Sequence, residues 1–230
     1  SESKAGGGNS IAVGVNTSTS STAEFGIAIG DSATATGLRD IFIGHEAGFG
    51  RDTAATKDIN HNIGIGSSAG KNSQSSNLIA IGASAGEGLK GKNNVVIGTY
   101  ASSKSGVGAV TTNFTVSVGS FSHASKDYAV ALGYYSSASE EASVALGNAA
   151  SATQKRAVAV GLKAQSTGDS SIAIGNMSKA EKGNTIAVGA SSTAKAERAI
   201  AIGQAANASS LTSTAIGVKA VAAGTGAFAI

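Results

Sequence analysis

The chain has 230 residues, of which 32 are glycine, none is proline, tryptophan or cysteine, and only 13% are charged, a composition unlike that of an ordinary globular domain. The absence of cysteine excludes a disulfide framework and a cysteine-based metal site. The formal net charge is +3 with no dense stripe of lysine and arginine, which argues against a nucleic-acid partner. No apolar run is long enough for a transmembrane helix, and the N-terminus shows no signal-peptide pattern.

A phrase of the type Ile-Ala-Ile-Gly recurs along the whole chain and predicts one repeat domain over residues 1–230. Residues 1–118 carry irregular repeats, with insertions at 45–62 and 99–115, whereas residues 119–230 repeat regularly every 14 residues. A fixed period predicts a solenoid, in which each unit buries its apolar face only by stacking on its neighbours. The chain stops one residue before the next expected glycine, so we expect it to be part of a longer protein.

Each unit predicts two short strands. In one regular unit the aliphatic residues Ile172 and Ile174 alternate with Ala173, and the small residues Ser178 and Ala180 lie three and five positions after the glycine. Both sets have period 2, which is typical of strands. The glycine and the polar segment 181–184 supply the turns. The sequence therefore predicts an all-β protein, a parallel roll of about 14-residue coils with two strands each.

The first strand of most units is apolar on both faces, which is typical of a strand that is buried on both sides. One face can fill the coil, and we expect the other to meet identical chains arranged about an axis. We expect the Ile and Val side chains, such as Ile172, Ile174, Ile200 and Ile202, to be fully buried inside the coil, although the opposite assignment is also open. The alanine column then forms the interface between chains, at Ala145, Ala159, Ala173, Ala187 and Ala201.

The repeat resembles the head domain of the trimeric autotransporter adhesins, the YadA-like family. The resemblance rests on the 14-residue unit and on the small residues three and five positions after the glycine. It also rests on the Ile-Ala-Ile-Gly phrase and on the polar residues, such as Asn-Ser, that precede it. Clear instances are the segments 9–14, 171–175 and 184–189, which read Asn-Ser-Ile-Ala-Val-Gly, Ser-Ile-Ala-Ile-Gly and Asn-Thr-Ile-Ala-Val-Gly. The pattern covers essentially the whole chain. The first half departs from it where Gly-x-x-Ala-Gly segments lengthen the turns.

The resemblance implies a left-handed parallel β-roll in an intertwined homotrimer, displayed on a bacterial outer membrane by a stalk and anchor outside this sequence. It implies a head that binds host extracellular-matrix proteins of the collagen, fibronectin or laminin class, or host cells, and that has no catalytic activity. An alternative is an immune-evasion head that binds an immunoglobulin or a complement regulator. The departures in the first half leave the ligand open, because family members with one fold recognise different partners.

Other classes of function have weaker support. Left-handed β-helix acyltransferases repeat hexapeptides with three strands per coil, and ice-binding solenoids need a regular threonine ladder; neither pattern is present. The glycine-rich segment 86–91 leads into a strand rather than a helix, so we expect a turn and not a phosphate site. His45, Glu46, Asp58 and His61 bracket one insertion, but the spacing typical of a metal site is missing. We therefore expect no catalytic residue, cofactor or metal.

The candidate ligand-binding residues are aromatic. Five of the ten Phe and Tyr residues lie between positions 114 and 135. Phe121 and Tyr135 each follow a repeat glycine by two residues, so we expect them to stack one coil apart, with His123 and Tyr134 nearby. Two interpretations remain open: the rings pack beneath an insertion, or they form an exposed patch of the kind that marks interfaces. Together with the insertions 45–62 and 99–115, this patch is the predicted contact region.

Overall fold

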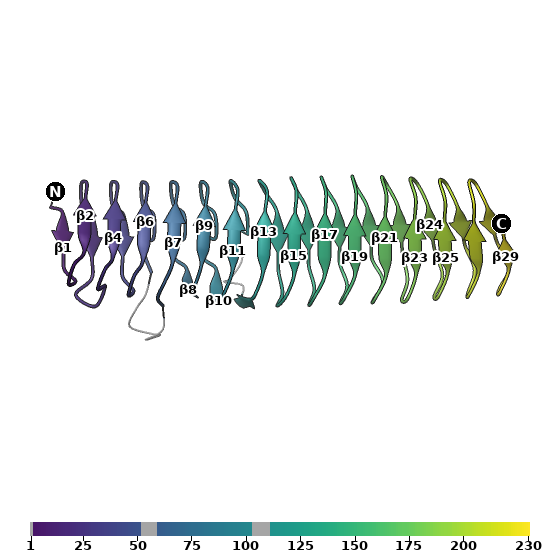
Figure 1. Ribbon diagram of the computed structural model, residues 1–230, viewed down its shortest axis with the longest axis horizontal. Helices are drawn as coiled ribbons and strands as arrows, with labels where there is room; N and C mark the ends of the chain where they lie inside the picture. The colour runs from purple at the N-terminus through teal and green to yellow at the C-terminus, as the bar shows by residue number, and fades with distance from the viewer. Residues whose placement is uncertain (1, 52–58, 103–110) are drawn as a thin grey trace. The chain divides into compact units, whose positions relative to one another are not determined.

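The structure is a computed structural model that describes residues 2–51, 59–102 and 111–230, and within these ranges every regular element is a β-strand. None of the described residues forms a helix that could cross a membrane. The chain divides into two compact units, Ser1–Ser122 and His123–Ile230. In each unit the backbone winds through successive coils, and equivalent strands pair in parallel (Figure 1). The predicted parallel solenoid is confirmed, and the description below takes the two units separately.

The first unit has one long parallel sheet and two shorter sheets on the other side of its coils. The long sheet contains, in spatial order, β2 (Ile11–Val13), β4 (Ile27–Ile29), β6 (Ile41–Ile43), β7 (Ile63–Ile65), β9 (Ile79–Ile81), β11 (Val95–Ile97) and β13 (Val116–Val118). The shorter sheets are β1 (Lys4–Ala5), β3 (Ser18–Thr19) and β5 (Thr34–Ala35), and β8 (Gln74–Ser76), β10 (Lys90–Lys92) and β12 (Thr111–Asn113).

The second unit repeats one coil with little variation. Its first sheet contains β15 (Val130–Leu132), β17 (Val144–Leu146), β19 (Val158–Val160), β21 (Ile172–Ile174), β23 (Ile186–Val188), β25 (Ile200–Ile202), β27 (Thr214–Ile216) and β29 (Phe228–Ala229). Its second sheet contains β14 (His123–Ala124), β16 (Ser137–Ala138), β18 (Ser151–Ala152), β20 (Gln165–Ser166), β22 (Lys179–Ala180), β24 (Thr193–Ala194), β26 (Asn207–Ala208) and β28 (Val221–Ala222). Each strand pairs with its equivalent 14 residues later, so that Ala173 lies beside Ala187 and Ala187 beside Ala201.

Alanine fills the interior of the coils. The middle residue of the first strand and the last residue of the second strand point inward and are fully buried, as for Ala173 and Ala180. Equivalent alanines form one core cluster that continues through Ala187, Ala194, Ala201 and Ala208. Because one short repeat supplies both walls of a coil, the space between the two sheets is thin, and small side chains fill it at the density of a protein interior.

The isoleucines and valines at the first and last positions of the first-sheet strands therefore lie on the outside, and the expected assignment of the two faces was wrong. Ile174 and Ile202 remain 40% and 38% exposed in the single chain, and Ile172 and Ile200 are half-buried. The physical reason is size: a branched side chain of four carbons at the inward position would overpack a coil that an alanine methyl group already fills.

The glycine that follows a first-sheet strand occupies a position closed to other residues. Gly147, for example, has a φ of +129°, and a Cβ atom there would lie 2.6 Å from the carbonyl oxygen of Gly161 in the next coil. A side chain would suffer both the strain of this backbone region and the collision. The repeat glycines thus set how closely successive coils approach.

One coil of the first unit holds an aromatic ring in place of alanine. Phe42 is the inward residue of β6 and is fully buried, and the equivalent residue of the next coil is Gly64. A Cβ atom at Gly64 would collide with the Phe42 ring, and one at Gly70 would lie 2.9 Å from it. The ring therefore occupies the space that the next coil leaves empty, which keeps the stacking continuous.

A buried ion pair lies beside this ring. Asp40 Oδ2 accepts hydrogen bonds from Arg51 Nη1 at 2.7 Å and from the backbone N–H of Gly37 at 2.8 Å, and both charged side chains are inaccessible to solvent. Asp40 Oδ1 accepts from the backbone and side-chain N–H groups of Asn62, each at 2.9 Å. The Arg51 Cζ atom lies 4.9 Å from the centre of the Phe42 ring. Burial lowers the pKa of Arg51, and the charge of Asp40 opposes this effect.

Arg51 also closes a sheet edge. It donates hydrogen bonds to the carbonyl oxygens of Ser73, through Nε at 3.3 Å, and Ser75, through Nη2 at 3.2 Å. These carbonyl groups belong to β8 and the residue before it, at the edge of the sheet that β10 does not cover. The guanidinium thus supplies N–H donors where a neighbouring strand would, and it fixes the chain within the predicted insertion 45–62.

Candidate functional site

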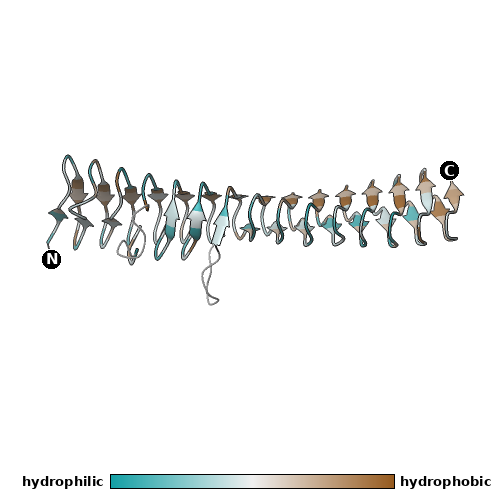
Figure 2. Cartoon of the chain, turned by 90° about the horizontal axis from the view of Figure 1, so that it is seen from below, coloured by the Kyte–Doolittle hydropathy of each residue, from teal (hydrophilic) through white to brown (hydrophobic). Residues whose placement is uncertain are grey.

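An apolar surface lies on the outer face of the first sheet in each unit. Figure 2 shows these strands in brown, whereas the strands of the second sheet are mostly white or teal. We call the outward Ile, Val and Leu side chains of the first-sheet strands the aliphatic ridge. Those of its members that are at least 36% exposed are Ile11, Val13, Ile29, Ile65, Ile79, Ile81, Leu132, Ile174, Ile202 and Ile216. A contiguous apolar surface of this kind marks an interaction site on a soluble protein.

The alanines expected at the chain interface do not belong to this surface. Ala145, Ala159, Ala173, Ala187 and Ala201 are all 0% exposed inside the coil of a single chain. A second chain cannot contact side chains that the first chain already encloses, so the predicted interface residues are wrong. The sequence could not decide between the faces by alternation alone, because both faces of the strand are apolar.

The predicted aromatic patch divides between the two units. Phe121, in the first unit, stacks on Tyr100 with ring centres 5.5 Å apart and planes 15° from parallel. Tyr134 and Tyr135, in the second unit, form an edge-to-face pair with ring centres 4.5 Å apart. Phe121 is 40% exposed and each tyrosine 51%. Each unit therefore presents an exposed aromatic pair, and the stacking of Phe121 on Tyr135 stays a prediction.

Backbone geometry explains why these rings reach the surface. Tyr100, Phe121 and Tyr135 each lie two residues after a repeat glycine and have left-handed φ angles of 55°, 57° and 53°. The same turn position holds Ser32, Ser68 and other small or polar residues elsewhere, so the chain accepts any outward side chain there. Tyr100 was missing from the predicted patch, although its place two residues after Gly98 was visible in the sequence. His123 begins β14, at the start of the second unit.

The predicted insertions are described only at their ends. Residues 52–58 and 103–110 lie outside the described residues, and Asp58 of the considered metal set is among them. His61, at the other end of the first insertion, has its Nε2 atom 3.2 Å from Arg39 Nη1, and Arg39 Cζ lies 5.9 Å from the centre of the Phe25 ring. Among the described residues no cluster of His, Asp and Glu side chains could hold a metal ion.

Charged turn residues of successive coils pair on the surface. Arg156 Nη2 lies 2.9 Å from Asp169 Oδ1, and Lys155 Nζ lies 3.6 Å from Glu141 Oε2. The pKa of Asp169 is lowered, first by a hydrogen bond from Ser170 and then by one from Arg156. Exposed pairs of this kind contribute little to stability. Their effect is to keep the turn edge polar.

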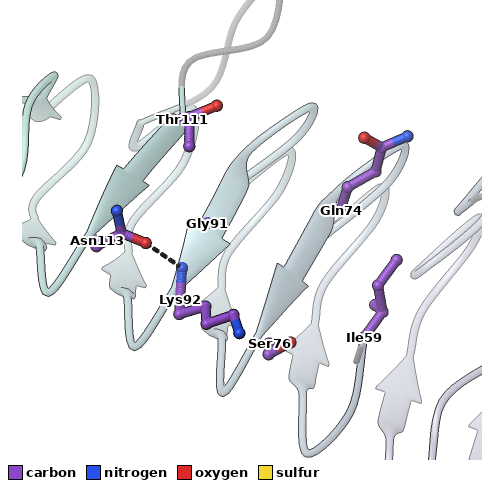
Figure 3. Close-up of a pocket in the computed structure, with 7 residues that line it drawn as sticks. All are labelled: Ile59, Gln74, Ser76, Gly91, Lys92, Thr111 and Asn113. Atoms are coloured by element: carbon purple, nitrogen blue, oxygen red, sulfur yellow. Dashed lines mark hydrogen bonds between the residues drawn. The ribbon is translucent and has the colours of Figure 1, made fainter. Parts of the chain in front are cut away.

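A hollow of about 310 Å³ lies in the first unit, on the side of the coils that carries the shorter sheets (Figure 3). It lies over the sheet of β8, β10 and β12, and the described residues that line it are Ile59, Gln74, Ser76, Gly91, Lys92, Thr111 and Asn113. Sequence reasoning missed this hollow, because its walls come from coils whose spacing is irregular. The only signal was the polar character of three segments at equivalent positions in successive repeats.

The chain is a β-solenoid repeat protein. Its coils have an alanine core, a glycine follows each first-sheet strand up to β27, and the aliphatic ridge lies on the outside. The family profile described as YadA head domain repeat, which spans two copies of the repeat, matches residues 21–41, 114–136, 138–164, 166–192, 180–206, 194–217 and 208–230. These matches cover more than half of the chain, which therefore belongs to the YadA head family, a family of adhesin heads and not of enzymes. No curated protein sequence matches the chain significantly.

Proposed function

We propose that the chain is the head of a homotrimeric adhesin, a left-handed roll displayed on a bacterial surface, that binds host extracellular-matrix proteins of the collagen, fibronectin or laminin class, or a receptor on host cells. Family membership carries this proposal. An adhesin head needs a rigid scaffold with a large outer surface, and the alanine-filled coils provide one. Three copies of each weak contact convert modest affinities into strong attachment.

The aliphatic ridge supports trimer formation. Ile174 and Ile202 project from equivalent positions of β21 and β25, and related side chains extend along the first sheet of each unit. Leaving such a surface in water costs about 25 cal/mol for every Å² of apolar area, so association of identical chains through the ridge is favourable. The ridge therefore replaces the alanine column as the proposed interface.

Light scattering of the purified chain tests the oligomer, with a mass of three chains expected. Replacing Ile174 and Ile202 together by Glu places charges on the ridge and should abolish the trimer. Thr193→Glu is the matched control, because Thr193 lies on β24 in the second sheet, away from the ridge. A stable monomer of the unchanged chain contradicts the proposal, and so does a double variant that still forms trimers.

A binding screen against collagen, fibronectin and laminin, with an immunoglobulin and a complement regulator in parallel, tests the ligand class. The proposed contact residues are the aromatic patch of Phe121, His123, Tyr134 and Tyr135. Replacing Phe121, Tyr134 and Tyr135 by Ser should weaken binding at least tenfold, a loss of about 1.4 kcal/mol. The melting temperature should stay unchanged because all three rings are exposed. A much lower melting temperature contradicts the contact role, as does unchanged binding.

A further inference from the structure

The hollow over β8, β10 and β12 is a built feature of the sheet. These strands have three residues each, whereas β3, β5 and the second-sheet strands of the second unit have two. Parallel pairing places Gln74, Lys90 and Thr111 in one row and Ser76, Lys92 and Asn113 in another. The extra residue per strand thus gives two polar rows across three coils, with the backbone of Gly91 between them (Figure 3).

Gly91 lines the hollow at a position that requires glycine. Its φ is +109°, a conformation that residues with side chains rarely adopt, and a Cβ atom there would collide with the carbonyl oxygen of Thr112. Glycine at this position therefore allows β10 to pair closely with β12. The pairing in turn holds the two polar rows in register.

The walls combine one cation, several neutral polar groups and one apolar side chain. Lys92 contributes an ammonium group, Gln74 and Asn113 contribute amides, and Ser76 and Thr111 contribute hydroxyl groups. Ile59, the apolar residue among them, is buried, with only 3% of its surface exposed. Asn113 Oδ1 accepts a hydrogen bond from the Lys92 backbone N–H at 3.0 Å, which orients the amide (Figure 3). Of the described residues that line the hollow, none is acidic.

We propose that this hollow binds one acidic sugar residue, a uronate, within a glycan chain. The carboxylate of the sugar pairs with the Lys92 ammonium group, and its hydroxyl groups exchange hydrogen bonds with the amides and hydroxyls. A volume of about 310 Å³ lies at the lower end of small-molecule sites and suits a single ring. This inference deepens the proposed adhesin function and rests on it, since it names the class of host molecule.

An extended acidic peptide fits this surface less well. Peptides commonly bind a sheet by adding a strand at a free edge. The hollow instead lies over the face of the middle strand, β10, and the carbonyl oxygens of Ser73 and Ser75 at the β8 edge are already bonded to Arg51. One ammonium group among amides and hydroxyls also matches a ligand with few charges and many hydroxyl groups.

The hollow is a departure from the regular family repeat. The described residues that line it all fall within 42–113, the stretch between the first two matches to the YadA head profile. The regular coils of the second unit carry two-residue strands at the equivalent position. The proposed site is therefore particular to the irregular half of this chain and is not a property of the repeat itself.

Calorimetric titration of the purified chain with a hyaluronan octasaccharide, in about 0.15 M salt to screen long-range attraction, tests the inference. We expect binding that becomes at least about tenfold weaker when the carboxylates of the sugar are reduced to alcohols, and equally weaker in Lys92→Gln, because a hydrogen bond to a charged group is lost in both cases. Gln74→Ala should weaken binding about threefold or more. Circular dichroism verifies that each variant is folded.

Lys163→Gln is the matched control, because Lys163 is an exposed turn lysine of the second unit and its replacement removes the same charge. Its affinity should stay within about twofold of the unchanged chain. An equal loss in Lys163→Gln would show general charge attraction and overturn the proposal. A poly-glutamate peptide that binds as tightly and displaces the sugar would assign the site to acidic peptides instead.

Attachment of beads coated with the chain to cultured cells separates this inference from the adhesin function. Beads that attach, together with a chain that binds no uronate oligosaccharide, overturn the sugar site and leave the adhesin function standing. Beads that fail to attach while the oligosaccharide binds to the Lys92 site contradict adhesion and support the site. Attachment that falls in Lys92→Gln and in the presence of free octasaccharide supports both.

Discussion

The pairing of Phe42 with Gly64 gives a sharp test of how the coils stack. Phe42→Ala removes a fully buried ring and leaves a cavity, and substitutions of this kind cost about 3–5 kcal/mol. Gly64→Ala introduces a methyl group that collides with the Phe42 ring, and overpacking of this kind costs about 1–3 kcal/mol. Each single variant should therefore unfold at a lower denaturant concentration than the unchanged chain.

The double variant should be less destabilised than the two single variants predict together. With Phe42→Ala present, the methyl group of Gly64→Ala enters the cavity and restores the alanine-on-alanine packing of the second unit. We expect the combined loss to lie at least about 1 kcal/mol below the sum of the single losses, because the two sites are in contact.

Urea unfolding followed by circular dichroism, at one fixed protein concentration, measures all four chains of the cycle. Gly183→Ala combined with Phe42→Ala is the control, because a Cβ atom at Gly183 would meet only the carbonyl oxygen of Asp169, at an ordinary 3.8 Å. Its effect should add to that of Phe42→Ala. Additive losses in the Phe42 and Gly64 cycle would refute the reasoning that the ring fills the space above the glycine.

Two further predictions concern charged groups. Arg51→Met should destabilise the chain by about 3–5 kcal/mol in the same unfolding assay, because Asp40 stays buried without its cation; adding Asp40→Asn should recover part of the loss, and no recovery would contradict this cause. For Asp169, Ser170→Ala and Arg156→Gln should each raise the lowered pKa, as measured by ¹³C NMR titration, because each removes a group that stabilises the charged carboxylate. Since the folded-state pKa of Asp169 is depressed, its contribution to stability is present above the unfolded-state pKa and is lost as pH falls through the folded-state pKa; an unchanged pKa in both variants would contradict the assignment.

Much of the fold follows from the period of the sequence. The spacing of the glycines predicts the stacked coils, and the alternation within each unit predicts two strands, both of which the structure contains. The direction of the faces did not follow, because alternation says that Ile and Ala point to opposite sides and not which side is enclosed. The volume of the coil decides this, since the inward position holds a methyl group more readily than a branched chain.

The candidate sites were less predictable from the sequence. The exchange of the usual alanine for Phe42 in one coil and for Gly64 in the next is visible as a large residue followed by a small one at equivalent positions. The role of Arg51 was not visible, because its partners Asp40, Ser73 and Ser75 lie up to 24 residues away and lack a fixed spacing. The hollow over β8, β10 and β12 was not visible either, because it forms only when three irregular coils are aligned.

The direction of the backbone hydrogen bonds has a mechanical consequence. Within each unit these bonds run from one coil to the next, so a pull along the stacking direction loads the coil boundaries in series and each boundary carries the whole force. Two of these boundaries have additional hydrogen bonds from buried side chains. Asp40 accepts hydrogen bonds from Asn62 of the next coil, and Asn94 accepts hydrogen bonds from Thr115 of the next coil. Under tension a unit therefore parts first at a boundary held by backbone bonds alone, and these buried side chains decide which coils separate last.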